Sequence, residues 1–499
     1  MKRFLPVIFY IAIFLLILSF SMSAQNFDFD LWARLIAGMG VVEGHHVLMH
    51  DFLSYTPVHI WYDHEWGSGV IFYLFLKLFG AYSLIILQAF LIFGIFFTSS
   101  LVLKLKKIEQ PYNILFYFFA IMSVLPTLNN PIRCHLFSFL LFTVFIYILE
   151  RARKNNYKLL YILPVLTIIW NNIHGGVTSG IGLILIFALG EYLNKKPIKH
   201  FLFAFVLSAM SLIINPWGIN YIKFLLMANT MVRADIAEWW GIFSKHQIAN
   251  YITFKLFLFT ILGTEFIYII KNIKNFYEKE DKVKWILFII TAYLAIAHVK
   301  LMPFFVIYSM CYAYEDFYKV FCFKLPKWKD SAIYAIILLI SLFSFVVKQF
   351  SLPINYTSYP VKEIEFIKLN DIKGNLLINF GLGSYASYKL YPQNKIFMDG
   401  RYEEVYYDYM VPMLKRFYLM TPGWDDVLKQ YKPDIMILEN YYPIYNYMKS
   451  SKDWIAIYEG KNFGVFVPVN KLKHHYKQPS NDSNYYKKTL FDTNIKIER

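Results

Sequence analysis

Long apolar runs separated by short polar loops dominate the first 350 residues of the chain. Each run holds about 15–24 apolar residues, the length that an α-helix needs to cross roughly 30 Å of hydrocarbon. The first run covers Phe4 to Ser21, and a long apolar region extends from Gly67 to Leu103. Further runs cover 111–127, 132–150, 157–173, 176–194, 199–215, 251–272, 284–298, 300–319 and 330–348. The pattern predicts an α-helical polytopic membrane domain over residues 1–350, with about 11 transmembrane helices.

The distribution of Lys and Arg predicts the topology of these helices. If the region from Gly67 to Leu103 crosses once, with 67–80 lying in the interface, all strongly basic loops share the side of the N-terminus. These loops begin at Lys104, Arg151, Lys195, Lys271 and Lys319. Basic loops mark the cytoplasmic side, so a single crossing is favoured over two. We therefore expect a multi-pass protein of the cytoplasmic (inner) membrane, with a cytoplasmic N-terminus, a first outer loop over 25–66 and an extracytoplasmic C-terminal domain.

The first apolar run could be a cleaved signal peptide, and the positive net charge could indicate a nucleic-acid partner. The run follows Lys2 and Arg3, as in a signal peptide, but it exceeds the usual length of about 7–15 apolar residues and favours an uncleaved span. The 50 basic and 34 acidic residues give a net charge of +16, which in a soluble protein would suggest nucleic acid. Because the basic residues concentrate in loops beside spans, we expect membrane lipid and no nucleic acid as a partner.

Composition changes after residue 350, where strand-like and helical segments alternate. Strand patterns cover 375–380, 395–399, 434–439, 454–459 and 463–469, and helical patterns cover 363–369, 403–418 and 425–430. Gly460 to Asn462 fits a hairpin turn. We predict a compact α/β domain over 351–470, followed by a polar, disordered tail over 471–499.

The first outer loop concentrates polar residues in an otherwise apolar region. Asp28 and Asp30 directly follow the first span, at the depth of a lipid headgroup. One of them is a candidate general base that removes a proton from an acceptor hydroxyl. The alternative is that both flank the start of a helix near Leu31, where acids are favourable. Arg34, four residues after Asp30, allows a helical ion pair and is a candidate substrate ligand.

The segment WYDHEW places Asp63, His64 and Glu65 between tryptophans. These side chains are candidates for binding a substrate phosphate or a divalent metal. Consecutive residues do not all face one point, so the run alone is a weak metal signal. The alternative is an interfacial turn anchored by the tryptophans, with solvated charges.

Other candidate substrate ligands lie in the predicted outer loops and in the C-terminal domain. Arg133 and Lys300 are cations that suit a phosphate, while Asn172 and His174 lie in WNNIHGG, between two tight spans. Each has a structural alternative, such as a snorkelling side chain or a hydrogen-bonded turn. In the C-terminal domain, candidate ligands Asp399 and Arg401 follow a strand in MDGRYEE, and a turn with an internal ion pair is the alternative.

The strings DLW, DFLSYT, DHEW, RxxLFS, WNNxHGG, NPWG and DGR, together with an acid after the first span, resemble a bacterial group within the GT-C superfamily of integral-membrane glycosyltransferases. The resemblance covers most of the chain. It implies a GT-C-like fold, a polyprenyl-phosphate-linked sugar donor and an envelope lipid, glycan or protein acceptor on the outer face. Asp30, or else Asp28, would match the catalytic acid of that superfamily, in an inverting transfer of a hexosyl or pentosyl group.

Two other classes of function compete with a transferase. A transporter or flippase of lipid-linked glycans would carry ionisable residues near the midplane of its spans, whereas here the polar residues lie at span ends. A non-catalytic envelope assembly protein would use its outer α/β domain and leave the polar cluster near the membrane without a function.

Overall fold

The computed structural model describes residues 5–23, 26–106, 114–128, 132–154, 156–233, 236–274, 276–321, 352–355 and 357–497, with four isolated residues between 339 and 346. The chain forms two compact units. Unit 1 comprises residues 1–24 and 85–351, and unit 2 comprises residues 25–84 and 352–499. The predicted apolar run over 330–348 falls largely outside the described residues.

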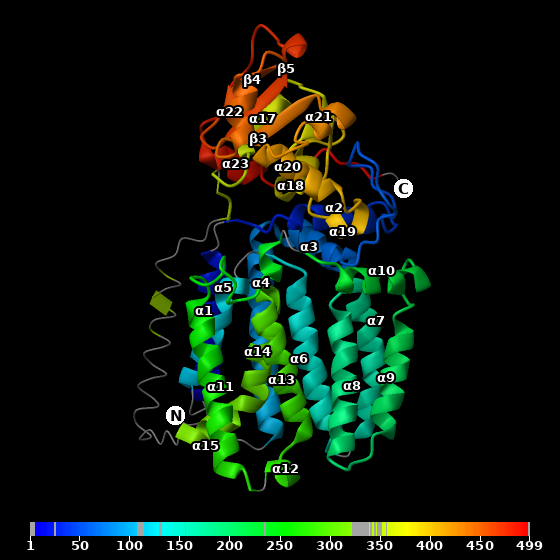
Figure 1. Ribbon diagram of the computed structural model, residues 1–499, viewed down its shortest axis with the longest axis vertical. Coiled ribbons are helices and arrows are strands. Elements are labelled where there is room, and N and C mark those ends of the chain that lie inside the picture. Colours follow the sequence, from blue (N-terminus) through cyan, green and yellow to red (C-terminus); the bar gives the residue numbers. More distant parts are fainter. Residues whose placement is uncertain are drawn as a thin grey trace. The chain divides into compact units, whose positions relative to one another are not determined.

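Most helices of unit 1 match the predicted apolar runs, whereas α10 and α12 lie between those runs (Figure 1). The helices are α1 (Leu5–Met22), α4 (Tyr82–Leu105, from Ile85 on), α5 (Ile114–Leu128), α6 (His135–Ala152), α7 (Leu163–Ile173), α8 (Val177–Leu193), α9 (Lys199–Ser211), α10 (Ile219–Thr230), α11 (Ile252–Asn272), α12 (Phe276–Lys279), α13 (Lys282–Ala297), α14 (Met302–Tyr308) and α15 (Tyr314–Phe321). Helix α9 packs against both α7 and α8, and α13 packs against α8 and α14.

Three described helices, α4, α6 and α11, are long and apolar enough to cross a membrane by length and composition. They support a membrane protein, while the number of about 11 spans stays a prediction. The region from Gly67 to Leu103 contains one such helix. Its first part forms α3 (Trp66–Phe79), which has 14 residues. At 1.5 Å per residue α3 measures about 21 Å, too short to cross roughly 30 Å of hydrocarbon.

Within unit 1, the polar motifs and the basic loops occupy different helix ends. Asn171 Nδ2 at the end of α7 donates to Leu212 O at the end of α9, 3.0 Å away. Among the basic loops, Arg153 after α6 bonds Glu191 of α8 and Asp281 before α13, at 2.9 and 2.8 Å. The basic loops that begin at Arg151 and Lys271 therefore meet at the end of α8, beside the loop that begins at Lys195.

Unit 2 combines a mixed sheet with surrounding helices (Figure 1). Its helices are α2 (Leu31–Val42), α3, α17 (Val361–Leu369), α18 (Phe380–Leu390), α19 (Tyr402–Val405), α20 (Met410–Leu419), α21 (Asp426–Tyr431), α22 (Pro443–Lys449) and α23 (Ser483–Thr489). Its strands are β1 (Gly374–Leu377), β2 (Asn394–Ile396), β3 (Ile435–Glu439), β4 (Trp454–Glu459) and β5 (Phe463–Pro468). All five predicted strands are present.

The strand order in the sheet is β2-β1-β3-β5-β4. Strand β1 pairs in parallel with β2 and β3, while β5 runs antiparallel between β3 and β4. The predicted hairpin turn joins β4 and β5, where Gly460 N donates to Phe463 O at 2.8 Å. Strand β3 is buried along its whole length, as expected of a central strand.

The segment 25–66, predicted as the first outer loop of the membrane domain, groups instead with residues 352–499 in unit 2. Leu53 O accepts a hydrogen bond from Ile396 N at 2.9 Å, and Tyr55 N donates to Ile396 O at 3.1 Å, so the loop extends the sheet beyond β2. Further along, His59 N donates to Val405 O at 2.8 Å. Helix α2 packs against α3 and α18. Backbone groups across more than 300 positions of sequence thus satisfy one another.

The tail over 471–497 is ordered, contrary to the prediction of disorder. Lys389 at the end of α18 donates to the carbonyl oxygens of Thr489 and Asp492, at 2.7 and 2.8 Å. Apolar side chains hold the segment as well: Tyr486 and Leu490 are each 2% exposed. The tail is polar on average, but its few apolar side chains pack in unit 2 and hold it against α18.

Candidate functional site

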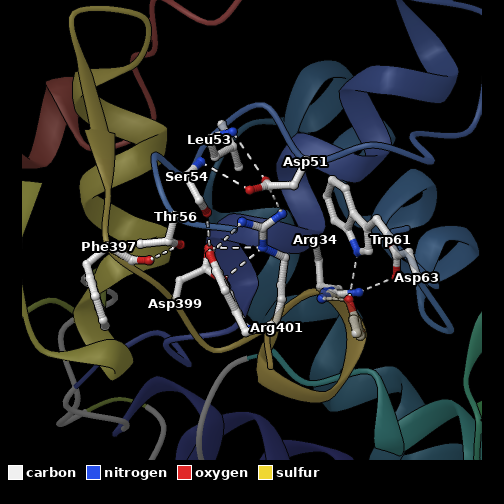
Figure 2. Close-up of polar contacts among 12 residues, drawn as sticks. Arg34, Asp51, Leu53, Ser54, Thr56, Trp61, Asp63, Phe397, Asp399 and Arg401 are labelled. Carbon is white, nitrogen blue, oxygen red and sulfur yellow. Dashed lines mark hydrogen bonds and ion pairs between the residues drawn. The ribbon is translucent and has the colours of Figure 1, made fainter. Parts of the chain in front are cut away.

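Arg34 is the centre of a buried charge group formed by three segments of unit 2 (Figure 2). Its guanidinium forms ion pairs with Asp63 and with Glu404 of α19, the latter at 3.0 Å. Glu65 Oε2 lies 3.4 Å from Arg34 Nε. Trp61 Nε1 donates to Glu404 Oε2 at 2.8 Å. The start of α2, the segment 61–66 and α19 are therefore fixed together by one guanidinium, with three carboxylates around it.

His64 joins this group from its more exposed side. Its Nδ1 lies 2.9 Å from Glu404 Oε1, and its Nε2 lies 3.6 Å from Glu65 Oε1. Burial would lower the pKa of His64, but Glu404 and Glu65 outweigh burial and raise this pKa to about 9. Burial raises the pKa of Asp63 to about 7, against the opposing effect of Arg34. The imidazole is thus a cation at neutral pH, so the group is close to electrically balanced.

His64, Glu65 and Glu404 also have the donor geometry of a metal site. One ligand atom from each residue lies within 4.8 Å of the others. An imidazole with two carboxylates suits a divalent ion such as Zn²⁺. A metal would have to displace the proton of His64 and compete with Arg34 for Glu404. We call these three residues the HEE group.

Asp28 and Asp30 occupy different environments, although both lie at the start of α2. Asp28 is 8% exposed, and its Oδ1 accepts a hydrogen bond from Asp30 N at 3.1 Å. Asp30 is the N-cap residue of α2, partly exposed, and its carboxylate makes no capping hydrogen bond to the helix. Its Oδ1 lies against Gly400, where a Cβ would collide with it. The hydrogen bond of Asp28 fits the helix alternative, and the predicted role of either acid as general base stays a prediction.

A second buried charge group joins Arg401 to Asp399 and Asp51 (Figure 2). Arg401 Nε donates to Asp399 Oδ1 at 2.9 Å, and its Nη1 donates to Asp51 Oδ1 at 2.8 Å. All three side chains are 0% exposed. Arg401 Nη2 also donates to the Tyr406 hydroxyl at 3.3 Å. Without accessible surface, Asp399 and Arg401 cannot touch a substrate in this conformation, and the geometry favours the structural alternative over the predicted substrate contact.

In unit 1, Arg133 and Lys300 lie around one carboxylate. Arg133 forms a bidentate ion pair with Glu238, with Nη2 3.1 Å from Oε2. Burial would raise the pKa of Glu238, but Arg133 and Lys300 lower it to about 2. Lys300 Nζ lies 5.6 Å from the ring centre of Trp239 and makes no hydrogen bond or ion pair among the described residues. The structure thus unites two predicted ligands in a net positive group.

Asn172 and His174 are engaged at the junction of α7 and α8. Asn172 Nδ2 donates to the carbonyl oxygens of Ile168 and Ile214, at 2.8 and 2.9 Å. His174 Nδ1 accepts from Gly176 N at 2.9 Å and lies 2.7 Å from Ser138 Oγ. These contacts fit a hydrogen-bonded turn, and the predicted substrate role of both residues stays a prediction.

Sequence reasoning missed Glu404, Asp51 and Tyr406 as members of these groups. Glu404 lies in the predicted helix over 403–418, and its signal was the pair of acids in GRYEEVY. Asp51 was visible only as one acid in a polar loop. Each is defined by a partner that is far away in sequence: Glu404 is 370 positions from Arg34, and Asp51 is 350 positions from Arg401.

Comparison with solved structures shows that the chain shares its fold with arabinofuranosyltransferase AftD from mycobacteria, with a TM-score of 0.51 and 12% identity over 95% of this chain and 40% of that chain. A mutant of AftD matches with a TM-score of 0.50 and 13% identity, over 94% of this chain and 41% of that one. The chain thus spans about two fifths of the length of AftD. No family model and no curated protein match the sequence.

Proposed function

We propose that the chain is a membrane glycosyltransferase that moves a sugar from a polyprenyl-phosphate-linked donor to an envelope acceptor, on the outer face of the cytoplasmic membrane. The observation that supports the proposal is a fold like that of arabinofuranosyltransferase AftD, in which a partly exposed carboxylate, Asp30, lies at the start of α2 and against Gly400. Asp30 is the general base. The buried groups around Arg34 and Arg401 position the segments on either side of it.

The reaction is an inverting displacement at the anomeric carbon of the donor sugar. Asp30 accepts the proton of the acceptor hydroxyl while the oxygen of that hydroxyl forms a bond to the anomeric carbon. At the same time the bond from the anomeric carbon to the phosphate oxygen breaks. The departing group is polyprenyl phosphate, whose negative charge needs preorganised cations.

The proposal includes no requirement for a metal ion. The HEE group would hold a divalent ion, which would supply positive charge to a phosphate. However, Arg34 and protonated His64 already balance its carboxylates. At neutral pH, an imidazole with a pKa of about 9 loses its proton only at a cost of about 3 kcal/mol, which weakens ion binding by roughly two orders of magnitude.

The test is sugar transfer by purified protein in nanodiscs, with radiolabelled polyprenyl-phosphate sugars and envelope acceptor fractions. Asp30→Asn should lower the rate at least about 100-fold, because general bases typically contribute 10²–10⁴-fold. Asp28→Asn is the matched control, since the amide oxygen can still accept the hydrogen bond from Asp30 N. It should stay within about tenfold of wild type. Undiminished transfer by Asp30→Asn would remove Asp30 as the base.

The orientation has its own test. Alkaline phosphatase, which is active only outside the cytoplasm, is fused after Leu103, at the end of α4. The single crossing predicts an inactive fusion. A fusion after Asn470 should be active. Activity at Leu103 would invert the topology and place the acid-rich loop on the cytoplasmic side.

A further inference from the structure

The sheet of unit 2 has a topological switch point between β1 and β3. Strand β1 is flanked by β2 on one side and β3 on the other, and all three are parallel. The connection from β1 to β2 and the connection from β2 to β3 therefore run in opposite directions across the sheet. In open α/β sheets, ligands bind outside the carboxyl ends of the strands at such a point. At this edge Asp399 and Arg401, which follow β2, are already paired with each other, whereas the ends of β1 and β3 carry residues outside the groups described above.

The side chains at this edge come from the ends of both strands. Asn379 follows β1, and Glu439 is the last residue of β3. Asn379 and Tyr418 of α20 lie beside the Glu439 carboxyl group. Tyr442 lies beyond Tyr418, with ring centres 4.9 Å apart, and its ring centre is 4.6 Å from that of Tyr441. We call these five residues the switch-point cluster.

The switch-point cluster contains buried polar atoms with incomplete hydrogen bonding. Glu439 is 3% exposed, and within the described part of the chain neither its Oε2 nor the Tyr418 hydroxyl makes a well-formed hydrogen bond. Such atoms are costly to bury and are rare in native proteins. Asn379 Oδ1 accepts from Gly381 N at 3.2 Å, which directs its NH₂ group elsewhere. The cluster thus offers donors and acceptors beside an aromatic surface, and Tyr441 is 68% exposed.

The chemistry of the cluster selects the class of ligand. The side chains that lie beside the Glu439 carboxyl group, Asn379 and Tyr418, are neutral hydrogen-bonding groups and bring no positive charge for an anionic ligand. Burial raises the pKa of Glu439 to about 7, so it can both donate and accept near neutral pH. An exposed tyrosine face packs on an apolar ring face and keeps a polar tip in water. A neutral sugar ring offers both features, an apolar face and a rim of hydroxyl groups.

We propose that the switch-point cluster binds a neutral sugar residue of a glycan, and that this glycan is the acceptor. The inference rests on the proposed transferase function and narrows its acceptor from a lipid, glycan or protein to a glycan. Tyr441 stacks on the sugar ring. Glu439, Asn379 and Tyr418 bond its hydroxyl groups.

The test is glycan binding without a sugar donor. The full chain, held in a zwitterionic detergent that has no sugar headgroup, is incubated with oligosaccharides released by mild acid from the envelope of the organism that makes it. Bound oligosaccharide is separated by gel filtration and measured by mass spectrometry. We expect wild type to retain it, and Tyr441→Ala and Glu439→Gln each to retain at least tenfold less. Tyr441→Phe, which keeps the ring, should bind like wild type.

The matched control is Tyr409→Ala. Tyr409 is also exposed, at 45%, but it precedes α20 whereas Tyr418 lies near the end of that helix. This variant should retain glycan like wild type. No retained glycan on wild type, or equal retention by all variants, would overturn the proposal. The binding assay contains no sugar donor, so it is independent of the transfer assay. Glycan binding by a chain that transfers no sugar would support this inference and refute the transferase. Sugar transfer by a chain that binds no glycan at this cluster would support the transferase and refute this inference.

Discussion

Replacing Arg401 by Met should destabilise unit 2 rather than selectively abolish substrate binding. Methionine fills much of the arginine volume but leaves Asp399 and Asp51 buried without their cation. Both carboxylates are 0% exposed. Removing one partner of a buried ion pair typically costs 3–5 kcal/mol, because an uncompensated charge stays behind. For a unit of about 150–250 residues this corresponds to a fall in Tm of roughly 6–20 °C.

The pH dependence of the Arg401→Met effect follows from the same charges. Burial would raise the pKa of Asp51, but Arg401 and Ser54 outweigh it and hold this pKa below its ordinary value. In wild type, Asp51 therefore contributes stability above the unfolded-state pKa of about 4, and this is lost as the pH falls below it. In the variant the pKa rises above that value, so protonation relieves the buried charge. The difference in Tm between the two proteins should be smaller at pH 5 than at pH 8.

The measurement must read unit 2 separately from the membrane helices. Proteins in detergent are heated in steps and exposed to a brief protease pulse, and peptides from 394–439 are quantified by mass spectrometry. Arg416→Met is the control, because Arg416 and Asp426 are 37% and 49% exposed at a separation of 3.8 Å. An exposed pair contributes about 0–1 kcal/mol, so its Tm should change by less than about 4 °C. If Arg401→Met kept the wild-type Tm while sugar transfer collapsed, Arg401 would be a substrate ligand and the structural interpretation would be wrong.

Three further outcomes test the site. Gly400→Ala adds a Cβ that collides with the Asp30 carboxylate and should lower transfer at least about tenfold with little change in Tm; wild-type activity would show that this position of Asp30 is unimportant. The free energy of unfolding of Glu439→Gln should rise by about 3 kcal/mol relative to that of wild type as the pH goes from 4.5 to 7. The raised pKa of Glu439 stabilises wild type fully at low pH, and this contribution is lost as the pH rises through about 7. A series of chemical denaturation curves across this pH range measures the difference. EDTA should leave transfer within about twofold, and a loss restored by Zn²⁺ or Mn²⁺ would assign a metal to the HEE group.

The sequence predicted the helices and strands of this fold better than it predicted which of them pack together. Apolar runs of spanning length predicted most helices of unit 1, since burial in lipid imposes length and composition directly, but they gave no signal for α10 and α12. Strand patterns located all five strands of the sheet. Helix α18, by contrast, was missed. Its sequence FGLGSYASYKL carries two glycines and no clear helical period, and tertiary burial together with the Asn379 cap forms the helix.

The site shows the same division between local signals and distant partners. The sequence singled out Arg34, Asp63, His64 and Glu65, and the structure does bring them together. The third carboxylate, Glu404, could not be assigned, because pairing across 370 positions leaves no trace in local spacing. The tail was misjudged for a related reason. Its anchors Tyr486 and Leu490 are isolated apolar residues whose role appears only where α18 receives them.

The polar stretch from Phe27 to Trp66 is therefore best explained as part of the α/β unit. Five of its charged residues form ion pairs within unit 2: Arg34, Asp51, Asp63, His64 and Glu65. Such pairs contribute rigidity at a high cost in desolvation. That cost is consistent with a need to hold the start of α2 in one place. Of the two acids at that start, one supports the helix and the other, Asp30, stays partly exposed against a glycine, which is the arrangement that a positioned general base requires.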